Sequence, residues 1–162
     1  MVVRLTAVAL FCSFGLNAAL AAPSRILILR HGEKVDVWKL CRIGQERAAA
    51  LAANYLGRDA ANSPFSPGDG PAAFLAITLP TLELAAPAAT TWSLPLTLYP
   101  VVPPKVNKDT ADQALNRVTQ QVVTDLMSNP AWQGKTVVMV WEHKHIANTK
   151  LGEGDAPAVA QA

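Results

Sequence analysis

The chain alternates between short, uninterrupted apolar runs and segments whose apolar residues recur every three or four positions. The apolar runs cover residues 26–29, 73–78, 94–99 and 136–141. Runs of this length are typical of strands buried on both faces of a sheet. Pro95 predicts an edge position for the third run, whereas the β-branched fourth run predicts a central strand.

The first predicted helix covers residues 48–56. Its alanine-rich sequence favours a helix, and Gly57 predicts the C-cap. Side chains three and four positions apart share one helix face, which marks the buried side. The positions predicted to be buried are Ala48, Leu51, Ala52 and Tyr55. A loop is predicted at residues 62–71, which are rich in Pro, Gly, Ser and Asp.

Two more helices are predicted from their start signals and their spacing. One covers about residues 81–90 with a proline in its first turn, and Pro87 is expected to end or kink it early. The other begins with a capping box formed by Thr110 and Gln113 and ends at Asn129. Its apolar positions, at amphipathic spacing, are Leu115, Val118, Val122 and Leu126.

The order of these elements predicts the fold class. Strands and helices in alternation predict an α/β fold with a mainly parallel sheet covered on both faces. Hydrophobic residues make up 51% of the chain and charged residues 16%, which argues against disorder. The formal charge is only +2 and no cluster of Lys and Arg is visible, which argues against nucleic acid as a partner.

The N-terminal segment, residues 1–21, is predicted to be a secretory signal peptide. Arg4 precedes an apolar run, and the segment ends in the cleavage motif Ala19-Leu20-Ala21. The apolar run is shorter than the roughly 20 residues that a membrane-spanning helix needs, so no stable membrane anchor is expected after cleavage. We therefore predict a secreted or periplasmic protein with a single domain over residues 22–162, of which about 153–162 form a flexible tail.

Chemically active side chains follow two of the predicted strands. Arg30 and His31 follow the first strand, and Glu142 and His143 follow the fourth. Parallel strands would bring both ends to one edge of the sheet, where ligands bind in open α/β folds. An arginine presents a planar fork for phosphate oxygens, and a neutral imidazole is a nucleophile. One imidazole can attack phosphorus while another, protonated, stabilises the phosphoryl oxygens, so the pattern predicts phosphoryl chemistry on a histidine.

The first apolar strand ends in Arg30-His31-Gly32-Glu33 and is followed by the pattern Gly44-x-x-Arg47-Ala48. This opening and the later strand ending in Glu142-His143 resemble the histidine phosphatase superfamily, which is phosphoglycerate mutase-like. The resemblance implies a three-layer α/β/α fold, with His31 as the phosphorylated nucleophile, Arg30 as a phosphate clamp and His143 in the phosphate pocket. It implies a phosphomonoester hydrolase whose partner is a phosphorylated small molecule or inorganic phosphate, in a two-step scheme that requires no metal or organic cofactor.

The sequence departs from the family pattern at the second phosphate-binding arginine. The family places it just after the second strand, where this chain has Thr78-Leu79-Pro80-Thr81. Lys105 or Lys108 is a candidate substitute, although an ammonium lacks the bidentate fork of arginine. The candidates for the proton donor to the leaving group are Asp109, Asp112 and Glu142.

Two other functions stay open. His143 and His145 would share one face if the strand continued that far, which is metal-ligand spacing, although no third ligand is evident.

The family normally continues into further sheet and helix elements after the second histidine segment. A shortened or degenerate member that binds phosphate or a partner without turnover is therefore the main alternative. The substrate is not predicted, because the loops at 62–71 and 101–109 carry no recognisable pocket chemistry.

Overall fold

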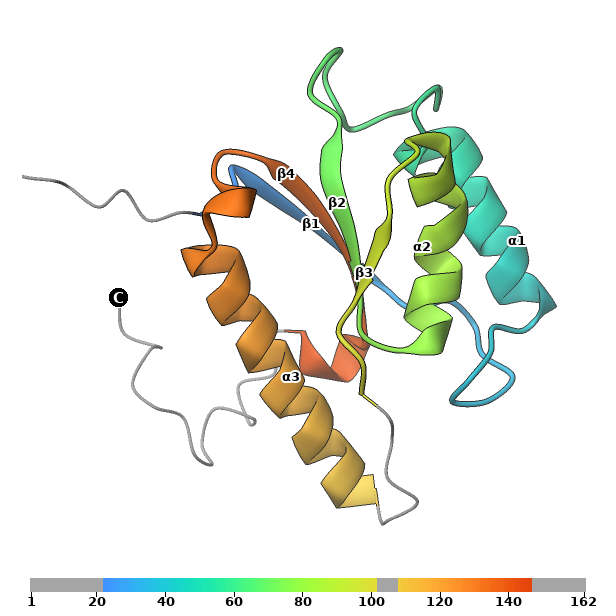
Figure 1. Cartoon of the computed structure of the whole chain (residues 1–162). Helices are drawn as coiled ribbons and strands as arrows, with labels where there is room; N and C mark the ends of the chain where they lie inside the picture. The colour runs from blue at the N-terminus through green and yellow to red at the C-terminus, as the bar shows by residue number, and fades with distance from the viewer. Residues whose placement is uncertain (1–21, 102–107, 147–162) are drawn as a thin grey trace, which may run out of the picture.

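The computed structural model describes residues 22–101 and 108–146, with the backbone alone for 108–110 (Figure 1). The predicted signal peptide and tail lie outside these residues. Strands and helices alternate along the described chain in the order β1 (Arg25–Arg30), α1 (Arg42–Leu51), β2 (Pro71–Ala76), α2 (Leu79–Thr91), β3 (Leu96–Leu98), α3 (Lys108–Ser128) and β4 (Thr136–Trp141). The predicted α/β alternation is therefore confirmed.

The strands form a four-stranded parallel sheet in the order β1-β4-β2-β3. β4 lies between β1 and β2, and all six of its residues are buried, which confirms the prediction of a central strand. β3 lies at the edge of the sheet, as Pro95 predicted. The last strand of the described chain is thus inserted into the middle of the sheet.

The prediction that the first strand is buried on both faces was wrong. β1 lies at the other edge of the sheet, next to β4, and Ile28 is 51% exposed. The apolar cluster beneath α3 is built mainly on β2 and β4, with only Ile26 of β1 packed at its margin. A short apolar run is therefore compatible with an edge strand when the covering helix lies over the middle of the sheet.

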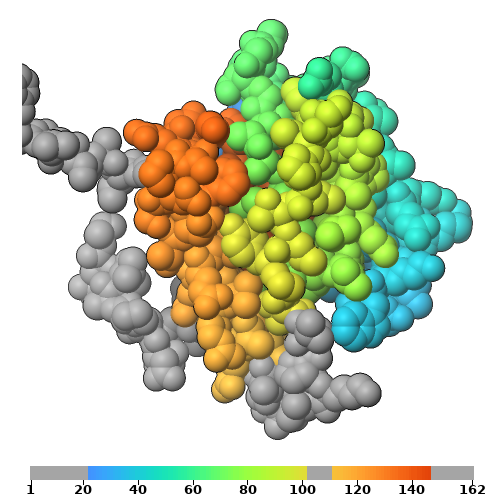
Figure 2. All heavy atoms as spheres, viewed as in Figure 1, coloured from blue at the N-terminus to red at the C-terminus, as the bar shows by residue number. Residues whose placement is uncertain are grey.

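Helices cover both faces of the sheet, so the described residues form three layers (Figure 1). α1 and α2 pack on one face through a cluster that includes Leu40, Leu84 and Phe74. α3 packs on the other face, where Val122 and Leu126 are fully buried, as their spacing predicted. Figure 2 shows the segment around β3 at the surface between α2 and α3.

Three local predictions for the helices need correction. Tyr55 is 50% exposed, because α1 passes into a π-helical turn, Ala52–Leu56, whose wider turn moves Tyr55 off the buried face that Ala48 and Ala52 keep. Pro87 does not end α2, which continues to Thr91. Thr110 does not cap α3, because the helix already includes Lys108. By contrast, Gly57 ends the first helical segment as predicted.

Candidate active site

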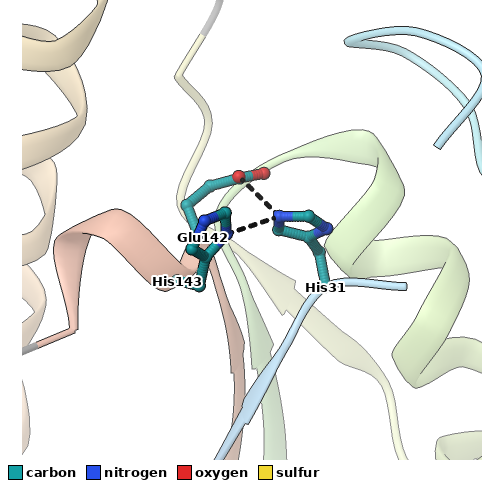
Figure 3. Close-up of side chains that lie close together, drawn as sticks. All are labelled: His31, Glu142 and His143. Carbon is teal, nitrogen blue, oxygen red and sulfur yellow. Dashed lines mark hydrogen bonds and ion pairs between the residues drawn. The ribbon is translucent and has the colours of Figure 1, made fainter. Parts of the chain in front are cut away.

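The ends of β1 and β4 lie side by side at the carboxyl edge of the sheet. The strands pair with Arg30 opposite Trp141, and the backbone N–H of His31 donates to the carbonyl of Trp141 at 3.0 Å. Glu142 and His143, which follow Trp141, therefore lie beside His31 (Figure 3). The prediction that these two strand ends meet is confirmed.

The ring of His31 is held by a backbone carbonyl. Its Nδ1 lies 2.7 Å from the carbonyl oxygen of Gly32. A carbonyl oxygen only accepts hydrogen bonds, so Nδ1 carries the hydrogen, and in the neutral ring the lone pair is on Nε2. That Nε2 lies 2.9 Å from Nδ1 of His143 and 3.5 Å from Oε2 of Glu142. His143 is then the donor to the neutral His31 ring.

The surroundings of His31 favour its neutral form. Burial lowers the pKa of His31 below its ordinary value of 6.5, and the nearby charge of Lys34 acts in the same direction. The hydrogen bond to Gly32 and the charge of Glu142 oppose this shift without cancelling it. At pH 7 the ring is therefore mainly unprotonated, with the lone pair of Nε2 directed at His143 and Glu142.

Glu142 is held as a carboxylate by two donors. The ammonium of Lys34 contacts both carboxylate oxygens, at 2.6 and 2.8 Å, and the hydroxyl of Thr78 donates to Oε1 at 2.8 Å. Burial alone would raise the pKa of Glu142, but the hydrogen bonds from Lys34 and Thr78 leave it below its ordinary value. Glu142 at neutral pH therefore accepts protons rather than supplying them.

Lys34 and Thr78 were not predicted as site residues. Thr78 follows β2, which pairs with β4, so it lies at the same edge of the sheet as His31 and Glu142. The strand-end rule that selects the histidines also selects Thr78 once β2 is placed beside β4. Lys34 is a single lysine in the loop after β1, and no sequence pattern distinguishes it from a surface lysine.

The loop that carries His31 is anchored by the start of α1. The amide of Cys41 donates to the carbonyl of Glu33 at 2.9 Å, and a Cβ on Gly44 would lie only 2.2 Å from that oxygen. Only glycine allows this approach of the helix to the loop. Arg47 adds an ion pair with the Glu33 side chain at 3.2 Å. The spaced glycine and arginine of the sequence pattern thus fix the backbone next to His31.

The guanidinium of Arg30 pairs with Glu33, and not with His31 or His143. It lies 3.4 Å from Oε1 of Glu33, and the Arg30 side chain is 54% exposed. The hydrogen bond from its own backbone amide, followed by the charges of Arg47 and Arg30, holds the pKa of Glu33 below its ordinary value. Glu33 therefore carries a negative charge between two guanidinium groups. The role of Arg30 as a phosphate clamp stays a prediction.

The predicted pairing of His143 with His145 on one strand face was wrong. β4 ends at Trp141, and His143–His145 form a 3-10 turn, so the alternation of a strand does not reach them. The ring of His145 is buried and hydrogen-bonds Asn116 of α3. Within the described residues, the ligand atoms that lie within 4.8 Å of one another belong to His31, Glu142 and His143.

The other candidates are only partly covered by the described residues. Asp112 lies 3.7 Å from His145, so in this structure its carboxylate faces that ring. The side chains of Lys105, Lys108 and Asp109 lie outside the described residues. Of the predicted proton donors, Glu142 is the one that the described residues place beside His31.

Comparison with known proteins adds no family to this picture. No protein-family model matches the chain, and no curated protein matches it. None of the helices in the described ranges is long and apolar enough to cross a lipid bilayer.

Proposed function

We propose that this chain is an exported phosphomonoester hydrolase that forms a phosphohistidine on His31, within a phosphoglycerate mutase-like fold. The observation that carries this proposal is the orientation of the His31 ring. Its Nδ1 is tethered to the Gly32 carbonyl, which leaves the lone pair on Nε2 at the carboxyl edge of the sheet. A tethered, neutral imidazole whose second nitrogen carries the lone pair is the arrangement that a histidine nucleophile needs.

In the first step, Nε2 of His31 attacks phosphorus and the bond from phosphorus to the ester oxygen breaks, so that the ester oxygen leaves as an oxyanion and takes a proton from solvent. The phosphoryl group takes the place next to Nε2 that Nδ1 of His143 now fills at 2.9 Å. The N–H of His143 then donates to a phosphoryl oxygen instead of to His31. This exchange places a hydrogen-bond donor where negative charge develops in the transition state.

In the second step, water attacks the phosphohistidine and the phosphorus–nitrogen bond breaks. The carboxylate of Glu142, 3.5 Å from Nε2, accepts a proton from the attacking water. The products are inorganic phosphate and neutral His31, and the proton returns to solvent. The hydrogen bonds from Lys34 and Thr78 keep Glu142 in the ionised form that this step needs.

The test is turnover of p-nitrophenyl phosphate, together with trapping of the phosphorylated protein by rapid denaturation. We expect turnover and a phosphoryl label that is stable in base and labile in acid. Both should be lost in His31→Ala and kept in His145→Asn, the matched control, after circular dichroism has verified the fold of each variant. A wild-type protein that phosphate stabilises but that leaves the ester intact would instead be a phosphate-binding protein.

Binding of a divalent cation such as Zn²⁺ is a second candidate function. It is favoured by the convergence of His31, Glu142 and His143, whose ligand atoms lie within 4.8 Å of one another. The ammonium of Lys34 competes for the same carboxylate, so a cation has to displace it. Calorimetric titration with Zn²⁺ separates the functions. A metal site predicts binding that His143→Ala abolishes, whereas the hydrolase predicts activity that a chelator does not change.

A further inference from the structure

An apolar cavity of about 140 Å³ opens at the same edge of the sheet as the His31 site. Its walls come from the loop after β1, the start of α2 and the end of β3. The residues that line it include Val37, Trp38, Thr78, Leu79, Leu98 and Val101. The walls are almost entirely carbon. The charged cluster beside the cavity consists of Glu142 and the residues that contact it, His31, Lys34 and Thr78.

Thr78 belongs to both the charged cluster and the cavity. Its hydroxyl donates to Glu142 at 2.8 Å, and the residue also lines the cavity. Along the carboxyl edge the strand order β1-β4-β2-β3 places His31, Glu142, Thr78 and Leu98 in succession. The charged cluster and the apolar cavity are therefore neighbours that share one residue.

Apolar side chains around the cavity remain in contact with water. Val37 is 56% exposed, Trp38 49% and Leu79 44%. Transfer of such surface from water to an apolar ligand is favourable. A gathering of large exposed apolar residues beside a polar site marks a ligand-binding surface more often than a chance arrangement.

The size and composition of the cavity suit one aromatic ring. An apolar protein cavity of roughly 150 Å³ is known to bind benzene, and this cavity has nearly that volume. Trp38 can pack against such a ring in an offset or edge-to-face arrangement. Because the Lys34 and Thr78 contacts hold Glu142 as a carboxylate, it does not protonate the leaving group. A phenolate, whose conjugate acid has a pKa of about 10, departs more readily without a donor than an alkoxide does.

We propose that the substrates are aryl phosphomonoesters, with the phosphate at His31 and the aromatic ring in the cavity lined by Trp38 and Val37. This inference rests on the proposed hydrolase function. In the reaction the bond between phosphorus and the aryl oxygen breaks, the phosphoryl group passes to Nε2 of His31, and the phenolate leaves and takes a proton from solvent.

The test compares phenyl phosphate with glycerol 2-phosphate on the full chain, on Val37→Asp and on Val123→Asp. Val123 is similarly exposed but lies on α3, away from the cavity lining, and serves as the matched control. A charge in an apolar pocket should lower kcat/KM for phenyl phosphate roughly ten- to hundredfold, mainly through KM. The loss for glycerol 2-phosphate in Val37→Asp should be much smaller, because this ester places no ring in the cavity, and the Val123→Asp control should change neither substrate.

Aryl esters are intrinsically more reactive than alkyl esters, and comparing each variant with the wild type on the same substrate cancels this difference. Trp38→Ala provides a second cavity variant in case Val37→Asp does not fold, and we expect the same selective loss. Equal loss for both substrates, or no loss for phenyl phosphate, would overturn the assignment of the cavity while leaving the hydrolase in place.

A binding measurement distinguishes failure of the inference from failure of the proposed function. If the wild type hydrolyses neither ester, the hydrolase proposal and aryl ester turnover are both overturned. Calorimetry with phenylphosphonate and methylphosphonate then tests the cavity itself. Tighter binding of the phenyl compound that is lost in Val37→Asp would support the aryl site, whereas equal binding of the two compounds would overturn it.

Discussion

Two histidines in this protein have similar surroundings but different partners. His31 and His145 are both mostly buried, and each has an acidic side chain nearby, Glu142 at 3.5 Å and Asp112 at 3.7 Å. Burial is the main cause that lowers the pKa of both rings. Burial and a shifted pKa therefore do not separate the proposed nucleophile, His31, from His145.

The difference lies in what each ring nitrogen faces. His31 gives Nδ1 to its neighbouring backbone carbonyl and turns Nε2 toward His143, another titratable side chain, at the edge of the sheet. His145 instead uses Nδ1 for Asn116 and thereby ties the turn after β4 to α3. The first arrangement leaves a nucleophilic atom where a ligand can replace a side-chain partner, and the second closes a contact between two elements.

After loss of the proposed nucleophile itself, replacing His143 with alanine should have the largest effect on activity. We expect kcat for p-nitrophenyl phosphate to fall by roughly 10²–10³, as on loss of one transition-state donor. The free energy of unfolding, measured by urea denaturation, should change by less than about 1 kcal/mol, because the lost hydrogen bond is largely exposed. His143→Asn, which keeps a donor, should recover part of the activity. An alanine variant with wild-type kcat would contradict the assignment of His143 to the phosphate pocket.

Replacing His145 with alanine should give the reverse result. The side chain is buried and its loss leaves the amide of Asn116 without this partner, so we expect a loss of about 1–3 kcal/mol in the free energy of unfolding. The kcat of the folded protein should stay unchanged. The same denaturation and activity assays apply, and a loss of kcat as large as in His143→Ala would remove the distinction between the two histidines.

Replacing Gly44 with alanine should disturb the loop that carries His31 but not the turn that carries His145. The added Cβ would press against the Glu33 carbonyl, so we expect a loss of about 1–3 kcal/mol in stability together with a lower kcat. Ile43→Ala is the control, because Ile43 is exposed on the same helix. Equal behaviour of the two variants would show that the approach of α1 to the loop does not matter.

The smallest effects concern the titration of His31. The charge of Lys34 lowers the pKa of His31 and the charge of Glu142 raises it, so Lys34→Met should move the pKa upward and Glu142→Gln downward. NMR titration of the ring in each variant measures this directly. In the active protein the acidic limb of the pH profile should lie below pH 6.5 and move in the same directions. Shifts of the same sign in both variants would contradict the described charges.

The same shift makes folding depend on pH. Because the folded pKa of His31 is lowered, the unfolded chain binds the proton first as pH falls. The stabilisation is therefore fully present above about pH 6.5 and is lost as pH falls through the folded pKa. Urea denaturation across this range should show a smaller pH dependence in His31→Asn than in the wild type.

The sequence was sufficient for the parts of the fold that depend on local pattern. Apolar runs placed all the strands of the described chain, and the spacing of Val122 and Leu126 placed the buried face of α3. The rule that parallel strands share a carboxyl edge then predicted that His31, Glu142 and His143 lie together. The prediction that these three residues lie together needed only that two segments are strands and that the two strands run parallel.

The predictions that failed depended on which elements pack against which. The exposure of Ile28 follows from the edge position of β1, and that of Tyr55 from a π-helical turn that spacing alone does not reveal. Lys34 and Thr78 both contact Glu142 because they follow β1 and β2, the two strands that flank β4. The prediction that His145 shares a strand face with His143 was wrong because β4 ends before both residues. A turn follows, and in it the ring of His145 hydrogen-bonds Asn116 of α3.

The central position of β4 has a consequence for how the chain is made. β4 is the last described strand to leave the ribosome, yet it separates β1 from β2 in the sheet. Until Trp141 has been synthesised, β1 and β2 lack the partner that joins them, and closing the sheet needs contacts between residues more than 100 positions apart, such as Arg30 and Trp141. Such distant pairing is slow, and it exposes unpaired strands to aggregation in the meantime. A nascent chain that stops short of β4 therefore has neither a joined sheet nor the partner of His31.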